Sequence, residues 1–368
     1  MAEPEFIRVD GSFGEGGGQI LRTSIALSTL TGKPVEVTNI RANRKFPGMM
    51  PQHLTAVKAC MAICNGTAEG ADINSERLRF IPGKVRYGKY SFDVAESKKS
   101  AGSATLVLQT VLLPLLFTKG ESTVIVKGGT HVPWSPPATY LKQVFLPALG
   151  LMGCQTFLKI GRWGWYPEGG GDLSLRIKPI NKLKPRQFTE RGKLRKVYGI
   201  SASSNLPRNI SDRQLKAAMR AMRTENLNAR MRSIDVKASG KGTIVHLTAE
   251  FENARAGFSC LGEKGLSAEK VANSAVTELI NYLGKNVCLD HYLADQLIPY
   301  AALCGERIEM DVSKITEHLR TNLWVTQKFI PIGYKLRGPK GLPGTLMIEP
   351  KREEDQQPAV ATAAEVTP

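Results

Sequence analysis

The 368-residue chain has few of the residues that build zinc sites or disulfide frameworks. It contains six cysteines without a C-x-x-C pair, and five histidines of which no two lie within four residues of each other. This spacing gives no support to a zinc site or a disulfide-stabilised fold, so the cysteines are interpreted as buried thiols. Cys60 and Cys64 are expected on one face of a helix.

Long apolar segments are also missing. The longest apolar run, residues 105–117, is too short to cross a membrane and contains Gln109 and Pro114. The first eight residues carry two glutamates and one arginine, without the apolar core of a signal peptide. We therefore expect no membrane association and a cytoplasmic location.

Acidic residues are too few to balance the basic ones. The chain has 50 lysines and arginines against 33 aspartates and glutamates, a net charge of +17. Residues 181–240 alone hold 15 basic and 4 acidic residues, a surplus of 11. This concentration favours a polyanionic partner such as nucleic acid. The alternative is a basic surface that serves only solubility.

The apolar pattern predicts a repeated module of strands and helices. The first predicted elements are a strand at 6–12, a helix at 19–32, a strand at 34–40, a helix at 51–66 and strands at 78–83 and 90–95. A second series follows, with a helix at 103–117, a strand at 122–129, a helix at 138–153 and strands at 154–161 and 171–179. Near the C-terminus we predict a helix at 289–305, a strand at 307–312 and a helix at 316–330.

Residues 183–284 interrupt this rhythm and predict a small basic α+β domain inserted into a larger one. Its predicted elements are a strand at 196–203, a helix at 211–223, strands at 234–240 and 243–251, and a helix at 267–284. The larger domain would then comprise residues 1–182 and 285–350. Residues 351–368 are polar and rich in alanine and proline, so a disordered tail is expected.

A glycine-rich turn between Gly11 and Gly18 contains five glycines and Glu15, and a helix is predicted directly after it. Free amides at a helix N-terminus attract phosphate. The turn is not a P-loop, since no G-K-[ST] follows, and Gln19 breaks the dinucleotide fingerprint. A phosphate site and a tight turn both remain open. The letters EGGG recur at 168–171, before a strand, where Glu168 is a weaker candidate.

Basic residues gather close to this turn in sequence. Arg22 follows it, and Arg41, Arg44 and Lys45 lie in a loop between a predicted strand and helix, either as a phosphate clamp or as a solvated loop. His318 follows Thr316, a suitable helix N-cap. Such a histidine is more often structural than catalytic, and the other four histidines look no worse.

Seven ordered segments resemble the signature segments of one family, the RNA 3′-terminal phosphate cyclases. They are DGSFGEGGGQILR, IRANRKFPGMMPQHL, SAGSATLVLQT, KGGTHVPWSPP, YPEGGG, LADQL and EHLRTN, within residues 5–350. The resemblance implies a mixed α/β (α+β) fold. Its large domain would contain three βαβαββ modules like those of enolpyruvylshikimate-phosphate synthase, with a small α+β domain inserted between the second and third.

The resemblance also implies a reaction. In this family a histidine attacks the α-phosphate of ATP and retains AMP, which then passes to an RNA 3′-phosphate. The neighbouring 2′-hydroxyl attacks the activated phosphate, expels AMP and leaves a 2′,3′-cyclic phosphate. AMP supplies the good leaving group that a phosphate monoester lacks. Partners would be RNA ending in a 3′-phosphate, ATP, and Mg²⁺ or Mn²⁺, and a homodimer is compatible with the family.

Motif by motif, the resemblance assigns roles to twelve residues. His318 would be the nucleophile and Glu15 a ligand of the divalent metal or of nucleotide phosphate. ATP contacts would come from Gln109, Pro136, Tyr292, Asp295 and Gln296. The RNA terminal phosphate or the triphosphate would meet Gln19, Arg22, Arg41, Arg44 and Gln52.

One residue departs from the pattern, and two rival functions remain. Trp134 in HVPWSPP is bulky where smaller residues are expected, so the adenine side of the pocket would differ. The family also has a non-catalytic branch of ribosomal RNA processing factors that lack the histidine. His318 and the LADQ segment argue against that branch. An enolpyruvyl transferase, suggested by the fold alone, would need no ATP.

Overall fold

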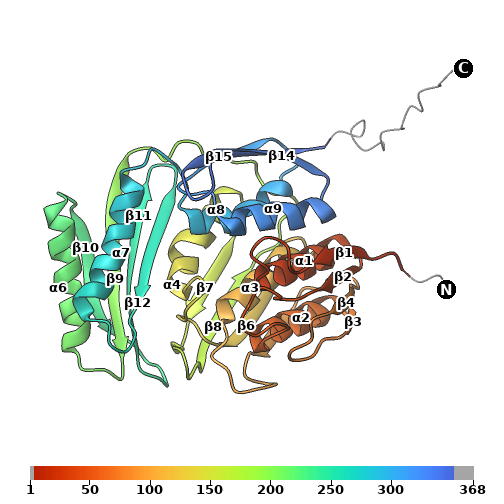
Figure 1. Ribbon diagram of the computed structural model, residues 1–368, viewed down its shortest axis with the longest axis horizontal. Coiled ribbons are helices and arrows are strands. Elements are labelled where there is room, and N and C mark those ends of the chain that lie inside the picture. Colours follow the sequence, from red (N-terminus) through yellow and green to blue (C-terminus); the bar gives the residue numbers. More distant parts are fainter. Residues whose placement is uncertain (1–3, 352–368) are drawn as a thin grey trace, which may run out of the picture.

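The computed structural model describes residues 4–351, which form four small sheets and their helices (Figure 1). The first sheet has the order β1-β2-β4-β3, with β1 and β2 parallel and the remaining neighbours antiparallel. Its module runs through β1 (Ile7–Asp10), α1 (Gly18–Thr31), β2 (Val35–Thr38), α2 (Pro51–Cys64), β3 (Thr67–Glu69) and β4 (Leu78–Ile81). This is a βαβαββ unit.

The second module repeats this topology. Its sheet has the order β5-β6-β8-β7, again with one parallel pair and two antiparallel pairs. The elements are β5 (Lys89–Asp93), α3 (Ala104–Leu116), β6 (Ser122–Gly128), a helical segment of α4 (Ala138–Tyr140), η1 (Leu141–Phe145) and α5 (Leu146–Leu151), then β7 (Thr156–Ile160) and β8 (Gly171–Ile177).

The third module keeps the pattern except for its first strand. Its sheet has the order β13-β15-β14, and α8 precedes it. The elements are α8 (His291–Ala302), β13 (Ile308–Val312), α9 (Glu317–Phe329), β14 (Ile332–Arg337) and β15 (Gly344–Pro350). Where the first strand would lie, Phe188 and Leu289 make isolated parallel bridges to β13. The insertion lies in the sequence between Phe188 and Leu289. It divides the segment that would form the first strand, so only these two single bridges to β13 are present.

The predicted fold class is confirmed by these sheets, because the two complete modules share one topology and the third retains most of it. The helices of the three modules pack against one another, α1 against α2, α3 and α9, and α8 against α9, with the sheets outside them (Figure 1). One core runs through all three modules.

The inserted segment forms a separate four-stranded sheet, ordered β10-β9-β11-β12, with α6 and α7 packed on it and a core of its own. Its elements are β9 (Leu194–Ser204), α6 (Asn209–Thr224), β10 (Ala229–Asp235), β11 (Gly242–Phe251), β12 (Arg255–Leu261) and α7 (Ala268–Leu283). The domain limits at residues 183 and 284 stay a prediction. The predicted disordered tail falls, apart from Lys351, outside the described residues.

Two details of the insertion were predicted wrongly. The strand expected at 234–240 lies at 229–235, an edge strand on which exposed Arg230 and Arg232 alternate with the less exposed Ala229 and Met231. Strand β12 was not predicted; it returns from β11 after only three residues. All six cysteines are free thiols. The prediction that they are buried is confirmed for Cys60, Cys64, Cys154 and Cys288, whereas Cys260 and Cys304 are only partly buried. No helix within residues 4–351 is long and apolar enough to span a membrane.

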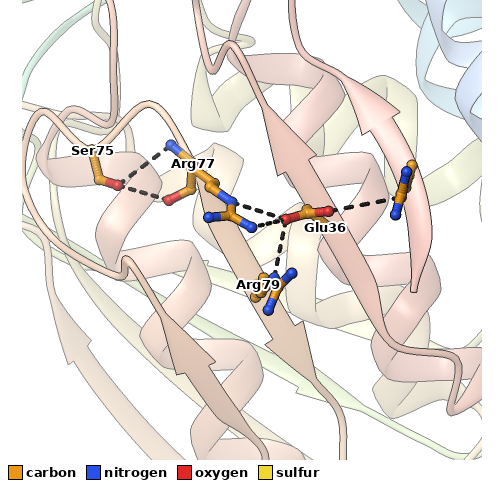
Figure 2. A network of polar contacts seen from close by, with 5 residues as sticks. Glu36, Ser75, Arg77 and Arg79 are labelled. Atoms are coloured by element: carbon orange, nitrogen blue, oxygen red, sulfur yellow. Dashed lines mark hydrogen bonds and ion pairs between the residues drawn. The ribbon is translucent and has the colours of Figure 1, made fainter. Parts of the chain in front are cut away.

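A carboxylate at the centre of the first sheet gathers three arginines (Figure 2). Glu36 Oε1 accepts hydrogen bonds from Arg77 Nε at 2.8 Å and Arg79 Nε at 3.0 Å. Arg8 and Arg79 stand opposite Glu36 on the neighbouring strands, so the three side chains share one face of the sheet. These hydrogen bonds hold the pKa of Glu36 below its usual value of 4.5.

We predict that Glu36→Gln lowers the free energy of unfolding at pH 7 by about 1 kcal/mol, because its arginine partners are partly solvated. Because the pKa of Glu36 is lowered in the folded protein, its ionised carboxylate stabilises the fold above pH 4.5. This stabilisation is lost as the pH falls through the folded-state pKa. Urea denaturation at several pH values should therefore show the difference closing in acid. Glu121→Gln, at the exposed Arg176 pair, is the matched control and should change less. A difference that widens in acid would contradict this account.

Candidate active site

All twelve residues predicted for the site line a single cavity of about 930 Å³. They come from all three modules, and β12 of the insertion supplies part of the wall. The predicted residues on the cavity are Glu15, Gln19, Arg22, Arg41, Arg44, Gln52, Gln109, Pro136, Tyr292, Asp295, Gln296 and His318. Their collection in one place is consistent with the predicted roles but does not test them.

The glycine-rich turn packs against helices so closely that side chains would not fit. Gly14 has a φ of +60°, and a Cβ there would lie 2.4 Å from Thr321 Oγ1 of α9. A Cβ on Gly18, which lines the cavity, would lie 2.0 Å from His53 Nε2. Helix α1 begins at Gly18 with no side-chain cap. The turn therefore leaves amides of the α1 N-terminus available to an anion at the cavity.

The second EGGG segment has a different position. Gly169 and Gly170 have φ values of +68° and +70°, and β8 begins at Gly171. This confirms that the second copy leads into a strand. Glu168 is not among the residues that line the cavity and instead lies beside Gly240 of the insertion. The weaker candidate is therefore outside the site.

His318 is held between two residues of the glycine-rich region. It is the second residue of α9, whose N-cap Thr316 accepts a hydrogen bond from Leu319 N at 2.9 Å. Its Nδ1 lies 2.5 Å from Gln19 Oε1, and its Nε2 lies 3.1 Å from Glu15 Oε2. Both partner oxygens accept, so the protonated ring can donate from Nδ1 to Gln19 and from Nε2 to Glu15. In the neutral form that keeps the proton on Nδ1, Nε2 has the lone pair. Burial lowers the pKa of His318 and favours that neutral form, while the Glu15 charge opposes the shift.

The arginines of the cavity differ in how well their charges are balanced. Arg44 lies 3.1 Å from Glu15 Oε1. Arg41, with a φ of 59°, donates to the carbonyls of Phe46 and Gly48, both at 2.7 Å. Arg22 has no carboxylate partner among residues 4–351, and burial lowers its pKa to about 10. It stays charged at neutral pH, and an anion in the cavity would balance it.

A chain of buried hydrogen bonds lies behind His318. Thr23 Oγ1 donates to Asn322 Oδ1 at 2.7 Å, and Asn322 Nδ2 donates to the Asp295 carbonyl at 2.7 Å. Thr316 Oγ1 donates to Asp295 Oδ1 at 2.6 Å. Helix α9 is thereby joined to α1 and α8. Sequence reasoning missed Thr23, and it quoted Asn322 in EHLRTN without giving it a role.

The predicted ATP contacts occupy another part of the cavity. Gln109 Nε2 donates to Gln296 Oε1 at 2.5 Å, and Gln296 Nε2 donates to the Tyr292 carbonyl at 2.6 Å. The Pro136 carbonyl accepts from Thr105 Oγ1 at 2.8 Å. Two amides from α3 and α8 thus meet beside an exposed tyrosine ring, which suits a nucleobase. The side-chain carboxyl of Asp295 is already engaged by Thr316.

The insertion closes one side of the cavity, a contact that no sequence motif predicted. Gly257, Ser259 and Leu261 of β12 line it. Asp290, the N-cap of α8, accepts from Tyr140 OH at 2.8 Å and from Gly257 N at 3.1 Å. This buried carboxyl joins the second module, the insertion and the third module. Burial raises its pKa to about 6.

A divalent metal would have few protein ligands here. Within residues 4–351 no group of three or more His, Cys, Asp or Glu side chains is arranged to hold a metal ion. Glu15 is the cavity carboxylate next to His318. Magnesium is commonly held by one or two carboxylates together with substrate phosphates. The donor set fits a metal that Glu15 would hold with bound phosphates.

Comparison with known proteins finds matches over most of the chain. The family model described as RNA 3′-terminal phosphate cyclase matches residues 13–336. A protein of that name from Trichormus variabilis is 44% identical over 326 residues, covering 88% of this chain and 94% of its own. Another, from Thermococcus kodakarensis, is 43% identical over 347 residues, covering 94% and 98%.

Among solved structures, the enolpyruvyl transferase NikO from Streptomyces tendae matches with a TM-score of 0.26 and 11% identity, covering 94% of this chain and 66% of that one. So low a score carries no weight beside the sheet topology. The family model and the relatives both span well over two thirds of the sequence. The chain therefore belongs to the RNA 3′-terminal phosphate cyclase family.

Proposed function

We propose that the protein converts an RNA 3′-phosphate into a 2′,3′-cyclic phosphate at the expense of ATP, through AMP carried on His318. The observation that carries this proposal is the geometry of His318, whose Nδ1 lies against Gln19 and whose Nε2, the nucleophile of the neutral ring, lies 3.1 Å from Glu15 Oε2. The names of the relatives supply the substrate class. The cavity supports it with uncompensated positive charge at Arg22.

The reaction has three displacements at phosphorus. His318 Nε2 attacks the α-phosphorus of ATP, a P–N bond forms, and the bond to pyrophosphate breaks. An oxygen of the RNA 3′-phosphate then attacks the phosphorus of AMP and releases the imidazole. Finally the 2′-hydroxyl loses its proton and attacks the RNA phosphorus, and AMP leaves with the bonding electrons. The first two steps place AMP, a good leaving group, on the RNA phosphate, and the third step expels it.

Other residues of the cavity would stabilise the charge that moves in these steps. Arg22, Arg41 and Arg44 line the cavity as cations and would neutralise phosphate oxygens. A divalent ion held by Glu15 would polarise phosphate oxygens when bound. Gln19 would keep the His318 ring in the tautomer that leaves Nε2 free. The cytoplasmic location and the homodimer stay predictions.

The direct test is labelling with α-³²P-ATP and Mg²⁺. We predict an acid-labile label on the wild type and none on His318→Ala, because no other nitrogen is held in the same way against Gln19 and Glu15. His291→Ala is the matched control, because it alters a histidine that does not line the cavity. A protein that binds RNA but takes no label would indicate a non-catalytic family member. Equal label on the wild type and His318→Ala would refute the assignment of His318 as the nucleophile.

The substrate test uses RNA ending in a 2′-deoxynucleotide 3′-phosphate. We predict that this RNA accumulates as the adenylylated end, since the missing 2′-hydroxyl is the nucleophile of the last step. The matching ribonucleotide RNA should become resistant to phosphatase. Gel analysis of both products separates the steps. Cyclisation of the deoxy end, or phosphatase-sensitive product from the ribonucleotide RNA, would contradict the order of events.

A further inference from the structure

Trp134 is the most exposed large hydrophobic residue of the described chain. Its exposed fraction is 94%, whereas the next, Phe46, is 64% exposed. No ring of residues 4–351 stacks on it, and no cation lies over it. Burying such a ring on folding would be favourable, so a large indole left in water requires an explanation.

The backbone holds Trp134 in this position. Its φ is 57°, a left-handed conformation that bulky residues rarely adopt. Pro133, Pro136 and Pro137 restrict the turn, Ser135 Oγ donates to the Val132 carbonyl at 3.1 Å, and the Pro136 carbonyl is tied down. Unusual backbone geometry held by its surroundings is concentrated at functional sites. The turn therefore fixes the point from which the indole extends into solvent.

Trp134 belongs to the same cavity as His318. Phe46, which has the next highest exposed fraction, also lines that cavity. It lies in the basic loop beside Arg44 and Lys45. Lys45 Nζ is 5.5 Å from the centre of the Phe46 ring. Exposed aromatic rings interleaved with cations are the combination that binds single-stranded nucleic acid, in which bases stack on rings while cations follow the phosphates.

We propose that Trp134 stacks on an unpaired base of the RNA strand, one of the nucleotides just upstream of the 3′-terminal nucleotide. The inference rests on the proposed function, which brings the 3′-phosphate to His318 and leaves the preceding nucleotides to follow the cavity outward. ATP is the competing partner, because its predicted contact Pro136 lies in the same turn as Trp134. Its other predicted contacts Gln109, Gln296 and Tyr292 are joined by hydrogen bonds in which Trp134 takes no part, which favours the RNA base for this ring. The protein would thereby favour single-stranded 3′ ends.

The test is fluorescence anisotropy with labelled single-stranded RNA that ends in a 3′-phosphate, without ATP. Trp134→Ala should weaken binding about tenfold or more, and Trp134→Phe should retain most of the affinity. Phe157→Ala removes an aromatic ring that is 61% exposed and lies outside the cavity, and it should bind like the wild type. The slope of affinity against salt concentration should not change, because stacking releases no counterions.

RNAs with one abasic nucleotide, at the second, third or fourth position from the 3′ end, locate the stacked base. One of these abasic RNAs should bind the wild type as weakly as intact RNA binds Trp134→Ala. Combining that abasic RNA with Trp134→Ala should weaken binding no more than either change alone. Unchanged binding by Trp134→Ala, or equal further losses at every abasic position, would overturn the proposal. Normal RNA binding with poorer labelling at limiting ATP would assign the ring to adenine instead. A wild type that takes no label from ATP would refute the proposed function and leave the binding result to decide on stacking.

Discussion

The site depends on one packing contact, that of α1 against α9. The buried Thr23–Asn322 hydrogen bond joins these helices across 299 residues of sequence. On α1, Thr23 lies one helical turn after Gln19, and on α9, Asn322 lies one turn after His318. The helix faces that make the Thr23–Asn322 bond therefore also bring Gln19 to His318. Gly14 must be a glycine for the turn to approach α9 so closely. The geometry of the candidate site and the packing of the core are therefore set together.

The insertion is part of the site as well as an addition to the fold. It leaves the third module at the position of the missing first strand, and β12 returns to line the cavity. The buried Asp290 carboxyl fixes this wall by accepting from Tyr140 and Gly257. The basic helix α6, in contrast, lies at the end of the molecule far from α1 and α9 (Figure 1). The basic surplus of the insertion and the few cations of the cavity are thus distinct features.

Much of the fold was predictable, because long apolar helices that end at a residue in the left-handed conformation have a clear local signal, as at Gly32 after α1 and Asn65 after α2. The edge strand β10 and the return strand β12 were not, since their sequences do not show which neighbour they pair with. The residues themselves gave no reason to choose His318 over His53, because its role comes from Gln19, far away in sequence. Resemblance to the family made that choice, and Trp134 stood out only as a departure from it.

The central claim is that AMP is carried by His318. The most direct measurement is mass spectrometry of a tryptic digest after incubation with ATP and Mg²⁺, under mildly alkaline conditions that preserve a P–N bond. Cleavage after Lys314 and Arg320 releases residues 315–320, a peptide in which His318 is the sole histidine. The account predicts the added mass of AMP on this peptide. AMP on another peptide, such as residues 46–58 with His53, would contradict it.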